Sequence, residues 1–380
     1  MNKCVIMTDS FKGTLSSLEI CHIARASIAK FFPTCEVNAV PIADGGEGTV
    51  DCFIEAIDAK PVAVTVCGPY GEKVQAVYAR AGEKAIIEMA SAAGLPLVGM
   101  NRNPASTTTY GVGELMHHAV SAGCTELLLG LGGSCTNDGG CGCAAALGVR
   151  FLNSTGNSFV PVGDTLGDIC SIDTSEVRKL LNGVTITVMC DVDNPLYGPT
   201  GAAHIFGPQK GADTEMVRHL DNQLRLLDAT IQRELGLSVA NIQGAGAAGG
   251  MGAGCIAFFG AELKSGIEAV LDMVNADRFL ENADIVFTGE GRVDTQSLHG
   301  KVLSGVAKRI QAKNIPLVAI VGSISEDADE AYAHGVTAMF GIDREAVAFE
   351  KYADRSAENY RRTLEDILRL IDTVGTRAHS

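Results

Sequence analysis

The chain has 380 residues, of which 46% are hydrophobic and 20% are charged, a balance typical of a globular protein rather than a disordered one. Its formal net charge of −15 argues against nucleic-acid binding, because such proteins need a basic surface to displace counterions. A chain of this length is expected to form about two or three domains.

The first sixty residues show a β-α-β-α pattern. A short apolar strand at residues 4–7 precedes a capping box at residues 16–19, and apolar side chains then recur with helical spacing as far as Phe31. A second strand is predicted at residues 37–42 and a second helix at residues 50–57. Strands that alternate with helices predict a parallel sheet with right-handed crossovers.

The middle of the chain begins differently. Three β-type runs at residues 62–66, 74–78 and 85–87 are joined by short turns, which favours antiparallel hairpins and a second domain that starts near residue 60. A helix at residues 112–121 and strands at residues 127–129 and 184–189 follow. Residues 244–261 carry no charge over a length that could span a bilayer, but they are too rich in glycine and alanine to insert. We predict a glycine loop that leads into a buried helix.

Alternation of strands and helices resumes toward the C-terminus, with strands at residues 284–287, 316–321 and 338–340 and helices at residues 302–312 and 361–373. We therefore predict an α/β fold with a Rossmann-like parallel-sheet domain formed from both chain ends, residues 1–60 and 276–380. Residues 61–275 are predicted to form an inserted α/β domain with hairpins and a glycine-rich phosphate loop.

The cysteines and the N-terminus indicate a cytoplasmic protein. The 12 cysteines are scattered without a CxxC pair, and Cys135, Cys141 and Cys143 have no histidine at zinc-like spacing. Buried free thiols in a reducing compartment are therefore expected. The N-terminal apolar run reaches Asp9 too soon to be a secretory signal.

Four segments rich in glycine and charged residues follow predicted strands, at residues 9–14, 43–49, 130–140 and 288–294. Glycine lets the backbone approach a ligand closely, and N–H groups at a helix start favour an anion. We interpret these segments as a site for a phosphorylated ligand. The segment at residues 132–140 is the strongest of them, because its hydroxyl, amide and N–H groups match what phosphate oxygens require.

Each of the other segments also has a structural interpretation. Lys12 could meet a phosphate or a carboxylate, whereas a simple turn would need only Asp9 as a helix cap. Asp44 and Glu47 could hold Mg²⁺ or accept a proton, but acidic residues also favour any helix start.

Two later segments also allow both a functional and a structural interpretation. Asp191 and Asn194 could bind magnesium or orient a hydroxyl, with Lys210 offsetting charge, and an Asx-Pro turn explains the first two equally well. Arg292 and Lys301 could clamp a carboxylate or phosphate and Glu290 or Asp294 could bind a metal; a surface salt-bridge cluster is the alternative.

Residues 244–249 match GxGxxG, but no convincing strand precedes them, which argues against a dinucleotide site. A flexible loop that lines the ligand cleft is the expectation. The sequence contains no GxxxxGK[ST], HRD, DFG or HExxH motif, so standard P-loop ATPases, protein kinases and zincins are set aside.

Seven segments together resemble the bacterial glycerate kinase family of the first type. They are residues 9–17, 41–49, 130–140, 190–203, 206–212, 244–254 and 288–301, in one order over most of the chain. Cys135 departs from the pattern, since alanine is expected there in many members. The resemblance implies ATP-dependent phosphorylation of D-glycerate to 2-phosphoglycerate with Mg²⁺, and two α/β domains that enclose a cleft.

Residue roles rest on the chemistry of the residues themselves. The catalytic candidates are Asp191, Asp44, Lys12 and Lys210. The candidates for holding the nucleotide phosphates are Gly132, Gly133, Ser134, Thr136, Asn137 and Asp138. Those for the substrate are Asp9, Ser10, Arg292 and Lys301, and those for the metal are Glu47, Glu290 and Asp294.

The expected partners are glycerate and ATP, with no nucleic acid and no membrane, and a homodimer is left open. Two rival functions remain. An NAD-dependent hydroxy-acid oxidoreductase is suggested only by the GxGxxG match, and a non-catalytic sensor of a phosphorylated metabolite would need no turnover.

Overall fold

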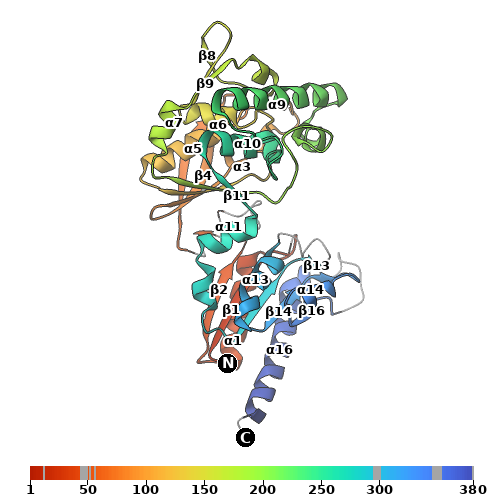
Figure 1. Cartoon of the computed structure of the whole chain (residues 1–380). Coiled ribbons are helices and arrows are strands. Elements are labelled where there is room, and N and C mark those ends of the chain that lie inside the picture. Colours follow the sequence, from red (N-terminus) through yellow and green to blue (C-terminus); the bar gives the residue numbers. More distant parts are fainter. Residues whose placement is uncertain are drawn as a thin grey trace. The chain divides into compact units, whose positions relative to one another are not determined.

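A computed structural model describes residues 1–11, 13–42, 50, 53–54, 57–293, 301–344 and 353–378 (Figure 1). Its contacts divide the chain into two compact units. The terminal unit comprises Met1–Asp44, Asp51–Ile57 and Val270–Ser380, and the central unit comprises Gly45–Val50 and Asp58–Ala269. Both units combine helices with β-sheet, so the predicted α/β class is confirmed.

The terminal unit is built on a five-stranded parallel sheet in the order β16-β14-β12-β1-β2. The strands are β1 (Lys3–Thr8), β2 (Glu36–Pro41), β12 (Ile285–Gly289), β14 (Leu317–Val321) and β16 (Ala338–Gly341). The N-terminal and C-terminal parts of this unit meet where β1 pairs with β12, with Cys4 opposite Ile285. Because β2 lies on one side of β1 and the later strands lie on the other, the strand order reverses there, and ligands bind at such switch points in open α/β sheets.

Helices cover both faces of this sheet. On one face α1 (Ser17–Phe31) packs beside α16 (Ser356–Ala378), and their core includes Ile6, Phe287 and Leu364. The predicted capping box is present, since Ser16 Oγ accepts from the N–H of Glu19 and the Glu19 carboxylate accepts from the N–H of Ser16. The apolar residues of α13 (Val302–Ile310) lie outside that core while the helix contacts β12, β1 and β14, which places it on the opposite face.

The other described elements of this unit are short. They are α12 (Ala276–Leu280), β13 (Arg292–Val293), η4 (Gln311–Lys313), β15 (Ser323–Ile324), α14 (Glu330–Ala333) and η5 (Ala353–Arg355).

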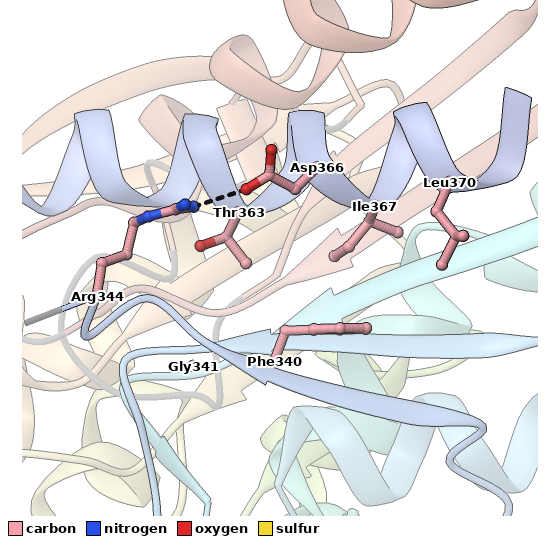
Figure 2. Close-up of a pocket in the computed structure, with 7 residues that line it drawn as sticks. All are labelled: Phe340, Gly341, Arg344, Thr363, Asp366, Ile367 and Leu370. Carbon is pink, nitrogen blue, oxygen red and sulfur yellow. Dashed lines mark hydrogen bonds and ion pairs between the residues drawn. The ribbon is translucent and has the colours of Figure 1, made fainter. Parts of the chain in front are cut away.

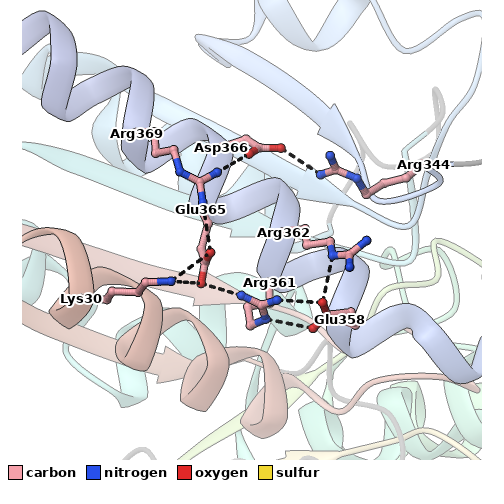
Figure 3. A network of polar contacts seen from close by, with 8 residues as sticks. All are labelled: Lys30, Arg344, Glu358, Arg361, Arg362, Glu365, Asp366 and Arg369. Carbon is pink, nitrogen blue, oxygen red and sulfur yellow. Dashed lines mark hydrogen bonds and ion pairs between the residues drawn. The ribbon is translucent and has the colours of Figure 1, made fainter.

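A polar network ties α16 to α1 and to the end of β16 (Figure 3). The buried carboxylate of Glu365 accepts from Arg361 at 2.7 Å and from Lys30 of α1 at 3.3 Å. Arg344 donates to Asp366 at 3.0 Å. These contacts fix the long terminal helix against the helix that follows the first strand.

A groove of about 390 Å³ opens between α16 and the end of β16 (Figure 2). Its apolar lining includes Phe340, Ile367 and Leu370, and the Arg344–Asp366 ion pair lies at its margin. None of the predicted site residues lines this groove.

The central unit contains a six-stranded mixed sheet in the order β11-β10-β6-β5-β4-β3. Its strands are β3 (Lys60–Cys67), β4 (Lys73–Ala81), β5 (Lys84–Glu88), β6 (Glu126–Gly130), β10 (Thr185–Met189) and β11 (Glu262–Lys264). β3, β4 and β5 pair antiparallel, which confirms the predicted hairpins. β5, β6, β10 and β11 run parallel, so their carboxyl ends share one edge of the sheet.

One face of this sheet packs against helices, with Leu129 and Val188 of the strands joined in one core by Leu115, Leu227 and Met251. The described helices of this unit, whether or not they pack on the sheet, are α3 (Ala90–Ala93), α4 (Leu95–Val98), α5 (Tyr110–Ser121), α6 (Cys141–Ala146), α7 (Ser175–Leu180), α8 (Ala202–Phe206), α9 (Thr214–Leu235), α10 (Ala247–Phe259) and α11 (Gly266–Met273), the last of which runs across the boundary of the two units. The unit also holds η1 (Gly163–Asp168), η2 (Pro208–Lys210) and a small sheet of β7 (Arg150–Leu152), β8 (Ser158–Phe159) and β9 (Ser171–Asp173).

The segment around residues 244–249 differs from the flexible cleft loop that the sequence suggested. Residues 244–250 are buried, and the helical path of α10 is interrupted at residues 248–250 by positive φ angles. A Cβ on Gly249 would lie 2.0 Å from the carbonyl oxygen of Thr136, and one on Gly254 would lie 2.3 Å from that of Gly139. The glycines therefore serve close packing inside the unit.

Among the described residues, no helix combines the length and the apolar character needed to cross a bilayer.

Candidate active site

The carboxyl edge of the central sheet gathers two of the predicted site segments. Gly130, the last residue of β6, lies opposite Glu88 of β5 and Met189 of β10. The segments that continue from β6 and β10, residues 131–140 and 190–194, therefore leave the sheet at the same edge, where ligand sites of parallel sheets are found.

The loop of residues 131–140 has an exposed and a buried part. Gly132 and Gly133 are exposed, whereas residues 134–140 are buried. Gly133 has a φ of 72°, which only glycine adopts easily, and its carbonyl accepts from the N–H of Leu95 at 2.9 Å. The N–H groups of Gly132 and Gly133 donate to no residue in the described part of the chain, and both glycines are exposed, so these two groups could meet an anion from solvent.

Asp138 organises the buried part of the loop. Its carboxylate accepts from the N–H and the Oγ1 of Thr109, both at 2.8 Å, and from the N–H groups of Gly140 and Gly142 at 3.1 and 3.2 Å. Burial raises the pKa of Asp138, and these hydrogen bonds oppose that effect. The N–H groups of Gly140 and Gly142, at the start of α6, are thus already bonded to Asp138.

Lys210 reaches the same loop from η2. Its ammonium donates to Ser134 Oγ at 2.8 Å and to the carbonyl oxygen of Thr136 at 2.7 Å. The side chain is fully enclosed, and burial lowers its pKa to about 8. Its hydrogen bonds fix the loop, and they hold the ammonium against Ser134 and Thr136.

Two further polar side chains of the loop are buried next to this lysine. Thr136 Oγ1 and both amide atoms of Asn137 have no hydrogen-bond partner among the described residues. Buried polar groups are normally satisfied, so unsatisfied ones mark places where a ligand or an ordered water completes the structure.

Asp191 and Asn194 follow β10 in a loop that packs on α9. Asp191 is exposed, and its Oδ1 accepts from the N–H of Gly266 at 2.8 Å. The Asn194 side chain donates to the carbonyl oxygen of Thr200 at 2.8 Å, so its amide helps to close the loop. Of the two, Asp191 is the side chain that presents a carboxylate at the sheet edge.

The terminal unit collects the remaining described site residues at its switch point. The N–H of Asp9 donates to the carbonyl oxygen of Gly289 at 2.9 Å, and the N–H of Ser10 donates to Asp9 Oδ1 at 2.6 Å. Glu290, which follows β12, is only 4% exposed and lies 3.8 Å from Lys301 Nζ. These four residues thus come together where β1 and β12 end.

Arg292 lies just beyond, in β13. Its side chain is exposed and its Nε donates to Ser325 Oγ at 3.1 Å. The other predicted residues, Lys12, Asp44, Glu47 and Asp294, lie outside the described residues. Within the described ranges, no group of three acidic, histidine or cysteine side chains forms a metal cluster.

Two residues at the carboxyl edge of the central sheet were not predicted from the sequence. Glu88 ends the apolar strand β5, and its Oε1 accepts from the N–H of Val50 at 2.8 Å. Thr109, at the start of α5, holds both Asp138 and the N–H of Cys143. A polar residue after an apolar strand was the available signal for Glu88, and the threonine run at residues 107–109 was the signal for Thr109.

The GxGxxG match does not form a dinucleotide site. No strand lies between α9, which ends at Leu235, and Gly244 in this fully described stretch, whereas that motif needs a strand directly before it. The motivation for an NAD-dependent enzyme is therefore removed.

Glycine-rich loops and charged side chains lie at the carboxyl edges of the parallel strands of both sheets, which is where α/β enzymes place their ligand sites. The sequence profile described as the glycerate kinase family matches residues 4–372, so the chain belongs to the glycerate kinase family, a family of kinases.

Individual relatives match the sequence of this chain over 90% or more of its length. The chain is 42% identical over 377 residues to a glycerate kinase of Bacillus subtilis (strain 168), covering 98% of this chain and 99% of that protein. It is 43% identical over 343 residues to glycerate 2-kinase of Escherichia coli (strain K12), covering 90% of each. A crystal structure of a protein assigned as glycerate kinase 2 from Salmonella typhimurium LT2 has a TM-score of 0.89 at 41% identity and covers 99% of both chains.

Proposed function

We propose that the protein transfers the γ-phosphoryl group of ATP to D-glycerate and forms 2-phosphoglycerate. The observation that carries the proposal is the 43% identity, over 90% of both chains, to a protein named glycerate 2-kinase. The geometry of the two sheet edges supports it. Phosphoryl transfer requires hydrogen-bond donors for phosphate oxygens, a cation and carboxylates, and these edges carry all three kinds of group.

In this proposal the exposed N–H groups of Gly132 and Gly133 bind nucleotide phosphate oxygens. Ser134, Thr136, Asn137 and Asp138 shape the loop from behind, and the unsatisfied Thr136 and Asn137 side chains supply further polar contacts. Lys210 offsets the charge that develops on the transferring group, and Lys12 has the same proposed role.

A carboxylate accepts the proton from the reacting hydroxyl of glycerate. Asp191 is the first candidate, because it is exposed at the end of β10 and the N–H of Gly266 fixes one of its oxygens. Asp44 is the second candidate.

The switch point of the terminal unit supplies groups for the carboxylate of glycerate and for a metal. Arg292 and Lys301 are the proposed cationic contacts, with Asp9 and Ser10 beside them. Mg²⁺ is usually bound by one or two carboxylates together with phosphate oxygens and water, so the buried carboxylate of Glu290 fits as a protein ligand, with Glu47 and Asp294 as further proposed ligands. When bound, Mg²⁺ neutralises charge on the phosphate oxygens.

We also propose a cytoplasmic location. The cysteines in the described part of the chain are free thiols, as a reducing compartment would keep them.

The test is ADP release coupled to a spectrophotometric readout, measured with D-glycerate, L-glycerate and other small hydroxy acids, with and without Mg²⁺. Phosphorus NMR of the product then shows which hydroxyl is phosphorylated. Asp191→Asn should lower kcat by about 100-fold or more, as loss of general-base catalysis does, while the nearby exposed Asp193→Asn serves as the matched control. No ADP release with D-glycerate would exclude the proposal.

A further inference from the structure

Helix α9 presents two buried carboxylates to the loop that carries Asp191 and Asn194. The N–H of Gly198 donates to Asp221 Oδ1 at 2.7 Å, and the hydroxyl of Tyr197 donates to Asp228 Oδ2 at 3.3 Å. Asp221 and Asp228 are 8% and 7% exposed. Buried carboxylates that accept hydrogen bonds from a loop fix it more firmly than exposed ion pairs do.

The same helix also holds Tyr197 from one face of its ring. The guanidinium of Arg225 lies 4.4 Å from the ring centroid, and Arg225 pairs with Asp221 at 3.5 Å. Burial and then the Asp228 carboxylate raise the pKa of Tyr197, so the phenol stays protonated and remains a donor.

Backbone hydrogen bonds and close packing hold the loop on the side of residues 240–246. The N–H of Leu196 donates to the carbonyl oxygen of Ala240, and the N–H of Gly246 donates to that of Asn194, both at 2.9 Å. A Cβ on Gly246 would lie 2.2 Å from the carbonyl oxygen of Pro195. The loop is therefore enclosed between α9 and the segment that enters α10.

We propose that Asp221, Asp228 and Tyr197 are positioning residues for catalysis. They hold the loop so that the Asp191 carboxylate stays at the end of β10 in the orientation that accepts a proton from the substrate hydroxyl. The inference rests on the proposed function, because it gives Asp191 its role.

The start of α9 links this loop to the phosphate loop as well. Lys210 lies in η2 directly before the Asp213 cap of α9, and it bonds to Ser134 and Thr136. Helix α9 thus contacts the loop of the proposed base and directly follows the segment that carries the buried lysine.

The experiment compares Asp221→Ala, Asp221→Asn and Tyr197→Phe with Glu215→Gln, an exposed acid on the same helix. We measure kcat, both KM values and the thermal unfolding midpoint. Asp221→Ala should lower kcat about 10- to 100-fold, because small misplacements of a catalytic group cost that much. Asp221→Asn should retain most activity, since its amide oxygen still accepts from Gly198, and Tyr197→Phe should lower kcat while KM for ATP stays unchanged.

Two results would overturn the inference, and they are distinguishable. If Asp221→Ala and Tyr197→Phe lower only the unfolding midpoint, and kcat well below that midpoint stays within about twofold of wild type, the contacts merely stabilise the fold. If the wild-type enzyme releases no ADP with glycerate, the proposed function fails and the positioning role fails with it.

Discussion

Lys210 Nζ lies 2.7 Å from the carbonyl oxygen of Thr136, although the two residues are 74 positions apart in the chain. Nζ also donates to Ser134 Oγ, so the lysine is bonded to neutral oxygens rather than directly to a carboxylate. Burying a charge that is hydrogen-bonded only to neutral acceptors costs free energy, and such charges are often found at functional sites. We propose that the task of this charge is to stabilise phosphate charge at the loop that Lys210 contacts.

Replacing this lysine by methionine tests that task. Lys210→Met keeps the length of the side chain and removes the charge, so kcat for ADP release should fall about 100- to 1000-fold, as loss of one preorganised electrostatic contact does. The matched control is Lys179→Met on α7, where the lysine is exposed and pairs only with Glu176. Equal turnover by Lys210→Met and wild type would show that Lys210 has no role in catalysis.

The lowered pKa of Lys210 predicts a pH dependence of stability. Below pH 8 the lysine is protonated in both states, and the folded protein carries the full cost of burying the charge. Above pH 10.5 it is neutral in both states and the cost is gone. The contribution of Lys210 to stability should therefore rise with pH between these values, by roughly 3 kcal/mol at about 1.4 kcal/mol for each pKa unit.

The measurement is urea unfolding of wild type and Lys210→Met at several pH values between 8 and 10.5, the interval set by the folded pKa and the ordinary one. Buried thiols such as Cys255 have raised pKa values and act in the opposite direction, but they are present in both proteins and cancel in the difference. The free energy of unfolding of wild type minus that of the variant should increase with pH. A difference that is constant or falls would mean that Lys210 titrates normally in the folded state.

Replacing Asp138 should lower the stability of the folded protein and not only its catalytic activity. Asp138→Ala leaves four donors, on Thr109, Gly140 and Gly142, without their acceptor in the interior. The free energy of unfolding should fall by about 3–5 kcal/mol, since each buried unsatisfied donor is costly. Asp168→Ala, at an exposed carboxylate in the same unit, should change it by less than about 0.5 kcal/mol. Similar values for both variants would contradict the role assigned to Asp138.

Local sequence signals predicted much of the fold. The capping box at Ser16 and Glu19 marked the start of α1, and the hairpins at β3 to β5 followed from short turns between β-type runs. Helix α9 was overlooked although its signals are present, with Asp213 as its cap, buried leucines at positions 220, 224 and 227, and Gly236 in the left-handed conformation at its end. Periodicity marks single elements well because it depends only on neighbours in the chain.

The site was harder to predict, because burial and long-range contacts decide which of its residues are exposed and which ones hold the loop. Ser134 and Asp138 lie in the same short motif as Gly132, yet only the glycine is exposed. Nothing near Lys210 in the sequence shows that its side chain ends at Ser134 and Thr136. Glycine content likewise suggested a mobile loop at residues 244–249, whereas three-dimensional packing requires those glycines.

That packing predicts how the GxGxxG segment responds to a single methyl group. At Gly249, with a φ of 70°, a Cβ would meet the carbonyl oxygen of Thr136 at 2.0 Å, so Gly249→Ala should lower the free energy of unfolding by at least about 3 kcal/mol. Gly156 has a φ of 79° with no atom within 4 Å, so Gly156→Ala should cost only the backbone strain, about 1 kcal/mol. Gly254→Ala separates the two effects, because that glycine is helical and alanine would otherwise stabilise it. Destabilisation by Gly254→Ala in urea unfolding would confirm contact with Gly139 as the cause, whereas stabilisation would show that α10 moves aside.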